Sequence, residues 1–182
     1  MIEISFFTGE LLFTLLWLTV RAVVWIRRKK VDPKREAVLL LMFVNLAVIF
    51  RFTFFPFFRI NGRVPPLVFD PDAILPFWIN LTPLVHMTAY TTRRELFLNI
   101  FGNLALFVPS GVIYPLVYPK LDRFWKVALA GFGLSLCIEL LQLLFAVRMT
   151  DVDDLILNTL GCLIGYGIYA AVCALFGKKA KT

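Results

Sequence analysis

The sequence predicts an all-α membrane protein, a polytopic bundle of about five transmembrane helices, and two observations lead to this fold class. Of the 182 residues, 60% are hydrophobic and 17% are charged, whereas soluble domains average roughly 45–50% apolar and about 25% charged residues. The apolar residues are also arranged in blocks of about 20, the length that crosses the core of a bilayer as a helix. We therefore expect a single integral membrane domain over residues 1–182.

The five predicted spans follow in chain order. The first lacks the basic start and the small-residue cleavage site of a signal peptide, and Arg27 to Lys30 follow it directly, so we interpret it as a retained helix. The others are uninterrupted apolar runs of spanning length. The expected ranges are 6–26, 37–55, 96–118, 125–147 and 155–176.

The connection between the second and third spans is long, from residue 56 to about 95. It contains six prolines, which exclude one continuous helix. Residues 73–79 are apolar and aromatic but too short to span, a pattern typical of interfacial or re-entrant segments. We expect this outer loop to be partly interfacial, either closing over a pocket between the helices or only shielding their ends.

The net charge of +7 predicts the orientation of the chain. Basic residues gather between the first two spans, between the third and fourth, and after the fifth. Five spans place these clusters on one side, which the positive-inside rule makes cytoplasmic, so the N-terminus is expected outside and the C-terminus in the cytoplasm. The charges flank spans and line no groove, so no nucleic-acid partner is expected.

Polar residues interrupt four of the five spans at one level, in the outer half of the bilayer. Ionisable groups at this depth cost about 2.5–3.5 kcal/mol each on insertion scales, so they are usually kept for a function. Pairs three or four residues apart share one helix face. The residues at this level are Arg51, Asn99, Asn103, Glu139, Gln142, Asp154 and Asn158.

The residue types allow three interpretations of this level. Arg51 and Arg148 with the amides resemble a socket for an anionic headgroup. Four carboxylates could instead hold a divalent cation as cofactor and supply catalytic groups, because hard cations prefer oxygen ligands. A third, structural interpretation is that Asp151 caps the fifth helix while the next two acidic residues suit its positive end. The candidate metal-ligating and catalytic residues are Glu139, Asp151, Asp153 and Asp154.

Four motifs in order resemble the VanZ-like family over about residues 37–176. They are Asn80-Leu-Thr-Pro83, the stretch from Asn99 to Pro109, Glu139-Leu-Leu-Gln142 and the stretch from Arg148 to Gly161. The departures, at Leu84 and Ser110, leave the polar motif positions intact. The resemblance implies a multi-pass protein of the bacterial cytoplasmic membrane that takes part in low-level resistance to the lipoglycopeptide teicoplanin.

The leading hypothesis is therefore an outward-facing polar pocket for an anionic lipid or a lipid-linked cell-envelope intermediate. One alternative is a metal-dependent hydrolase or transferase that acts on phospholipid or polyprenyl phosphate headgroups. Another is a structural, partner-binding protein without a ligand, so enzymatic activity is left open. The expected ligand-binding residues are Arg51, Asn80, Asn99, Asn103, Glu139, Gln142, Arg148, Asp151, Asp154 and Asn158.

Overall fold

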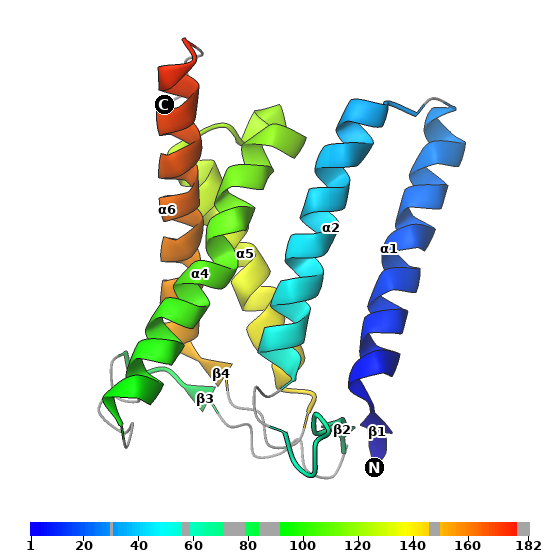
Figure 1. Ribbon diagram of the computed structural model, residues 1–182, viewed down its shortest axis with the longest axis vertical. Coiled ribbons are helices and arrows are strands. Elements are labelled where there is room, and N and C mark those ends of the chain that lie inside the picture. The colour runs from blue at the N-terminus through cyan, green and yellow to red at the C-terminus, as the bar shows by residue number, and fades with distance from the viewer. Residues whose placement is uncertain (30, 56–58, 71–78, 84–91, 146–149, 178–182) are drawn as a thin grey trace. The chain divides into compact units, whose positions relative to one another are not determined.

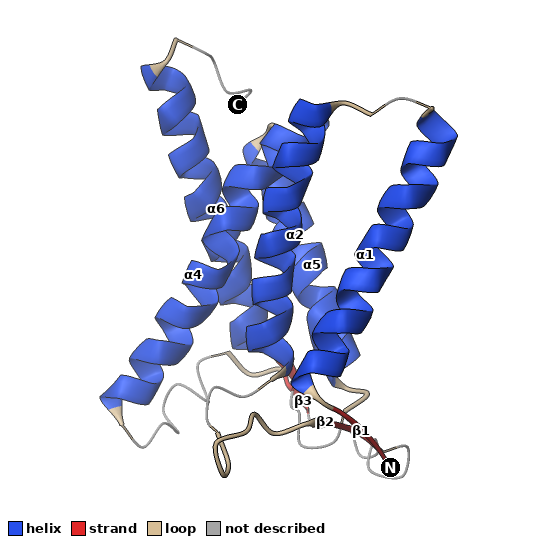
Figure 2. Ribbon diagram, turned by 45° about the vertical axis from the view of Figure 1, so that its right-hand side comes forward, coloured by secondary structure: helices blue, strands red, loops and turns tan. Residues whose placement is uncertain are grey.

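The structure is a computed structural model that describes residues 1–29, 31–55, 59–70, 79–83, 92–145 and 150–177. Within these ranges it contains five helices that are long and apolar enough to cross a membrane, as Figures 1 and 2 show. The predicted all-α, multi-span fold class is confirmed. The helices are α1 (Phe6–Arg28), α2 (Pro33–Phe54), α4 (Arg93–Val117), α5 (Phe124–Gln142) and α6 (Val152–Leu175).

Polar residues set where four of these helices begin. The side chains of Ser5, Asp32, Thr92 and Asp151 each accept a hydrogen bond from a main-chain N–H group of the first turn. Such capping satisfies donors that have no partner inside the helix. At α2, Pro33 follows the cap in the first helical position, where its missing N–H costs nothing.

The fourth span ends earlier than the sequence predicts. We expected a helix to residue 147, whereas α5 ends at Gln142. Residues 143–147 are all apolar, so hydropathy continues past the true end and cannot mark it. As a result, Glu139 lies in the last turn of the helix and not two turns below its end.

The chain divides into two compact units, Met1–Leu75 with Leu144–Val147, and Pro76–Leu143 with Arg148–Thr182. In the first unit α1 and α2 form an antiparallel hairpin. Arg21 on α1 and Glu36 on α2 form a salt bridge, and Phe13 stacks on Phe43 and Phe50 of α2. The short strands β1 (Ile2–Ile4) and β2 (Leu67–Phe69) pair antiparallel.

The second unit consists of α4, α5 and α6, with α6 packed mainly against α4 and also against α5. Gly161 and Gly165 have the spacing that lets helices approach closely. A Cβ atom at Gly161 would lie 2.4 Å from the carbonyl oxygen of Leu104, and one at Gly165 would lie 2.0 Å from that of Val108. The glycines therefore bring the main chains of α4 and α6 into contact.

Two very short strands join the start of α6 to a distant part of the chain. The strand β3 (Ile79–Asn80) pairs in parallel with β4 (Thr150–Asp151), in a register that places Asn80 opposite Asp151. The sequence predicts no strand here. Of the apolar loop segment 73–79, only Ile79 lies within the described residues, so its interfacial placement stays a prediction.

Candidate functional site

The end of α5 is tied to the start of α6 through Glu139. Its side chain is 3% exposed, and its Oε2 accepts a hydrogen bond from the main-chain N–H of Asp151 at 3.1 Å. Its carbonyl oxygen accepts one from the Thr150 hydroxyl at 2.9 Å. Glu139 therefore positions β4, the two residues directly before α6, through both its side chain and its main chain.

Asp151 has the capping role that the sequence predicts. Its Oδ1 accepts a hydrogen bond from the main-chain N–H of Asp153 at 3.0 Å and another from Asn80 Nδ2 at 3.1 Å. Asn80 in turn accepts a bond from the N–H of Thr82 at 3.1 Å, which fixes its amide orientation. Asp153 and Asp154 occupy the first turn of α6, as predicted, where the helix dipole favours negative charge.

A second connection joins α6 to α4. Asn103 Nδ2 donates a hydrogen bond of 2.5 Å to Asp154 Oδ1, and Asn99 lies one turn earlier on α4. The i, i+4 spacing of the two asparagines puts both on the face that meets α6. Asp154 is thus held by the Asn103 amide of α4, with Asn99 on the same helix face.

One helical turn deeper, Asn158 on α6 donates through Nδ2 to the hydroxyl oxygen of Ser135 on α5 at 2.9 Å. Asn158 is 2% exposed and Ser135 is fully buried. Within the part of the chain that the structure describes, Asn158 Oδ1 is the buried side-chain oxygen that lacks a hydrogen-bond partner. The polar layer therefore extends from the helix ends into the packed interior of this unit.

The site has a strongly acidic character. Asp154 lies close enough to Asp151, Asp153 and Glu139 for electrostatic interaction. Among the described residues, however, no three His, Cys, Asp or Glu side chains form a group that could hold a metal ion. The carboxylates of Glu139, Asp151 and Asp154 accept hydrogen bonds from main-chain N–H or side-chain amide groups. A divalent cation at Glu139, Asp151, Asp153 and Asp154 stays a prediction.

Burial separates the site residues into two sets. Glu139, Gln142, Asp153 and Asn158 are all less than a tenth exposed and form a buried base. The half-buried residues form a rim, the part of the site that is not fully enclosed. The rim consists of Asn80, Asn99, Asn103, Asp151 and Asp154.

The two arginines expected at this site are not among these residues. Arg51 belongs to the first unit, where its Nη1 donates to the carbonyl oxygen of Phe55 at 3.0 Å. Its guanidinium group lies over the rings of Phe6 and Phe52, 5.0 and 5.3 Å from their centroids. Arg148 lies outside the described residues. A role for either arginine in ligand binding stays a prediction.

Sequence reasoning missed two residues that the structure adds to the site. Ser135 lies four residues before Glu139, so helical spacing already places it on the same face of α5. Thr150 directly precedes the capping residue Asp151, but nothing in its sequence context indicates a bond to the main chain of Glu139. Both residues donate or accept a hydrogen bond to a residue of the buried base: Ser135 to Asn158, and Thr150 to Glu139.

Comparison with known proteins identifies the family. Residues 37–175 match the family model described as VanZ/LLP1, which covers α4, α5, α6 and all rim residues. The chain is 33% identical over 91 residues to Protein VanZ of Enterococcus faecium; the match covers 50% of this chain and 52% of that protein, about half the length of each. No solved structure matches the chain. With most of its length matched by the family model, this multi-span membrane protein belongs to the VanZ/LLP1 family.

Proposed function

We propose that the rim residues bind the polar headgroup of a membrane lipid or lipid-linked cell-envelope intermediate at the outer face of the bacterial cytoplasmic membrane. The observation that carries this proposal is the half-buried Asp154 carboxylate, which lies in the first turn of the membrane-spanning helix α6 and is held by Asn103 of α4. Burying an ionisable group in such a position costs free energy, so such a group is usually retained because it serves a function.

The chemistry of the rim supports a headgroup rich in hydrogen-bond donors. An ionised carboxylate has about four acceptor positions, so Asp154 retains acceptor capacity beyond its bond from Asn103. Asparagine amides can both donate and accept. Hydroxyl or amine groups of a saccharide or amino headgroup match such a surface. In this proposal, Arg148 supplies the contact to a phosphate group.

The buried base favours binding because it restricts the conformational freedom of the rim residues. Glu139 holds Asp151 from α5, and Asn80 holds it from β3. A site whose groups are already fixed loses less entropy when it binds. We therefore assign contact with the ligand to the rim and positioning to Glu139.

The outer location rests on the distribution of basic residues. The charged turn between α4 and α5 is expected in the cytoplasm, and the strands β3 and β4, which contain the rim residues Asn80 and Asp151, lie near the opposite ends of these helices. A protein that occupies or sequesters a lipid-linked target at the outer surface would reduce the amount of target accessible to a lipoglycopeptide such as teicoplanin. This would connect the site to the resistance that the family resemblance implies.

The test is teicoplanin susceptibility of a sensitive host that expresses the protein at equal membrane levels. Asp154→Asn keeps the shape of the side chain but removes its charge, and we expect it to abolish most of the protection. Glu3→Gln, which removes an exposed carboxylate from β1, is the charge-matched control and should protect like the wild type. Full protection by Asp154→Asn would remove this residue from the mechanism.

Two further measurements separate the alternatives. Phosphate release from lipid phosphates by the purified protein, if abolished by a chelator, would replace binding by metal-dependent hydrolysis. Thermal unfolding of Asp154→Asn in detergent tests the structural alternative. A variant that unfolds at the wild-type temperature but does not protect supports ligand binding, whereas parallel loss of stability and protection supports a helix lock.

A further inference from the structure

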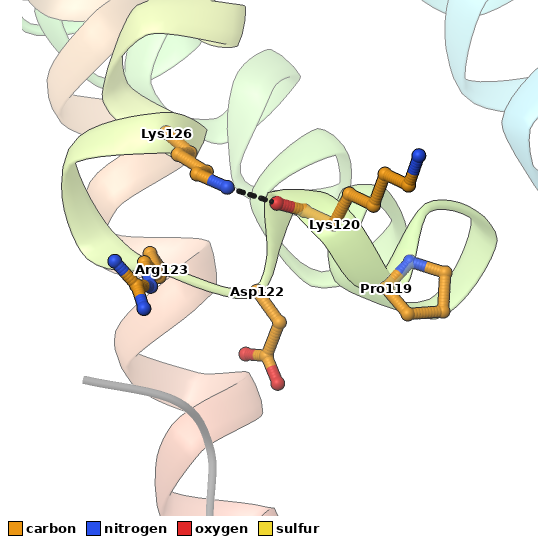
Figure 3. A pocket seen from close by; sticks show the side chains of 5 residues that line it. All are labelled: Pro119, Lys120, Asp122, Arg123 and Lys126. Carbon is orange, nitrogen blue, oxygen red and sulfur yellow. Dashed lines mark hydrogen bonds between the residues drawn. The ribbon is translucent and has the colours of Figure 1, made fainter.

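A pocket of about 350 Å³ lies at the turn between α4 and α5, away from the site described above. The turn contains a short 3₁₀ helix, Pro119–Leu121. The lining residues are Pro119, Lys120, Asp122, Arg123 and Lys126, drawn in Figure 3. Three of these five side chains are cationic and one is anionic, which gives the lining a formal charge of +2.

The cations are arranged unequally around the turn. Figure 3 shows Arg123 and Lys126 on the same side, while the side chain of Lys120 extends away from them. Lys126 Nζ donates one hydrogen bond of 2.7 Å to the carbonyl oxygen of Lys120, and an ammonium group has three donors. Lys126 and the forked guanidinium of Arg123 can therefore approach one anion together.

Two further features lower the cost of an anion here. Arg123 is the N-cap residue of α5, and in the described part of the chain no side chain caps this end. A helix N-terminus with open N–H groups favours negative charge. The one carboxylate of the lining, Asp122, accepts a hydrogen bond of 3.3 Å from the Tyr166 hydroxyl on α6.

The position of the turn indicates which anion it meets. The turn joins two spans, so it lies at a membrane surface whichever way the protein is oriented. Three exposed aromatic residues flank it: Tyr118 is 42% exposed, and Phe124 and Trp125 are each 56% exposed. Aromatic side chains of this kind gather at the level of lipid headgroups. A lipid phosphate is therefore at the right depth to enter the pocket.

We propose that this pocket is a binding site for the phosphate of an anionic phospholipid, with Arg123 and Lys126 as its principal contacts. The site is separate from the Asp154 rim and does not depend on the function proposed for it. It would fix the level of α4 and α5 in the leaflet that contains the basic residues.

The test is retention of defined lipids by the full-length protein in native mass spectrometry, after exchange into mixed micelles with phosphatidylglycerol or phosphatidylcholine. We expect the wild type to retain phosphatidylglycerol preferentially. Each Lys or Arg near a charged membrane surface contributes to affinity, so Arg123→Gln/Lys126→Gln should lower this retention about tenfold or more. Asp122→Asn, which removes the negative charge of the lining, should raise it.

The matched control is Arg27→Gln/Arg28→Gln, which removes the same charge from exposed residues at the C-terminal end of α1. We expect this variant to retain clearly more phosphatidylglycerol than Arg123→Gln/Lys126→Gln, because it removes general surface charge but no pocket contact, and a helix C-terminus disfavours anions. If both double variants lose retention equally, general surface charge explains the binding and the proposal is wrong. Arg123→Lys/Lys126→Arg keeps the charge and should keep the preference, even if the glutamine variant folds poorly.

Inorganic phosphate distinguishes a lipid from a soluble ligand. Millimolar phosphate should leave phosphatidylglycerol retention unchanged, because the aromatic residues and the acyl chains place the lipid in the pocket. If phosphate alone binds with the same dependence on Arg123 and Lys126 and displaces phosphatidylglycerol, the site is one for a soluble anion. That result would overturn the assignment to a lipid.

Discussion

The Glu139 carboxylate accepts a hydrogen bond of 3.1 Å from the main-chain N–H of Asp151, the residue that caps α6. The two residues are twelve positions apart: Glu139 lies in the last turn of α5, and Asp151 directly precedes α6. A buried side chain therefore determines where the first turn of α6 begins, and with it the position of Asp154. This relationship makes Glu139 a positioning residue in the site.

Glu139→Ala is expected to destabilise the protein, whereas Glu139→Gln keeps an oxygen that can accept the Asp151 N–H. Loss of the acceptor for a buried donor costs about 1–3 kcal/mol. The measurement is the apparent melting temperature in detergent, with Glu3→Ala as a control for removing an exposed carboxylate. Equal melting temperatures for the alanine and glutamine variants of Glu139 would contradict this account.

The bond from Asn103 to Asp154 should appear as an energetic coupling between α4 and α6. Hydrogen bonds to charged groups are worth about 1.5–3 kcal/mol, so a double-mutant cycle of Asn103→Ala and Asp154→Ala should give a coupling of about that size. Unfolding in a mixed-micelle denaturant series measures it. Asn61, exposed in a loop of the other unit, provides the control pair with Asp154, for which additivity is expected.

Gly161→Ala and Gly165→Ala should separate α4 from α6. The added Cβ would meet a carbonyl oxygen of α4 at 2.4 and 2.0 Å respectively, and overpacking of this kind costs about 1–3 kcal/mol or more. Both variants should lower the melting temperature and weaken the coupling of Asn103 to Asp154. Gly167→Ala is the matched control, since a Cβ there has no atom of the described chain within 4 Å.

Ser135 and Asn158 form a buried pair in which each side chain is the hydrogen-bond partner of the other. Ser135→Ala leaves the Asn158 amide without its hydroxyl partner and should cost about 1–3 kcal/mol. Ser135→Ala/Asn158→Leu removes both polar groups and should recover much of that loss, because two apolar partners leave nothing unsatisfied. Melting temperatures of the single and double variants test this; a double variant less stable than Ser135→Ala would show that Asn158 has another role.

Several features of the site could be predicted from the sequence because they depend on local spacing. The i, i+4 spacing of Asn99 and Asn103 places them on one face of α4, and the position of Asp151 before an apolar run predicts its capping role. The structure confirms the cap and brings Asn103 to Asp154. Local spacing cannot predict the contacts of Asn80 and Ser135, since their partners are 71 and 23 residues away in the sequence.

The sequence by itself determined the five membrane-spanning helices and the polar residues at their ends, because hydropathy and helical periodicity act over a few turns. It also carried the motifs of the VanZ/LLP1 family. The tertiary structure decided which polar groups meet. Periodicity defines a face on each helix but not the rotation and depth of neighbouring helices, and these depend on the close contact at Gly161 and Gly165. That packing divides the predicted polar level into a buried base that includes Glu139 and a half-buried rim that includes Asp154.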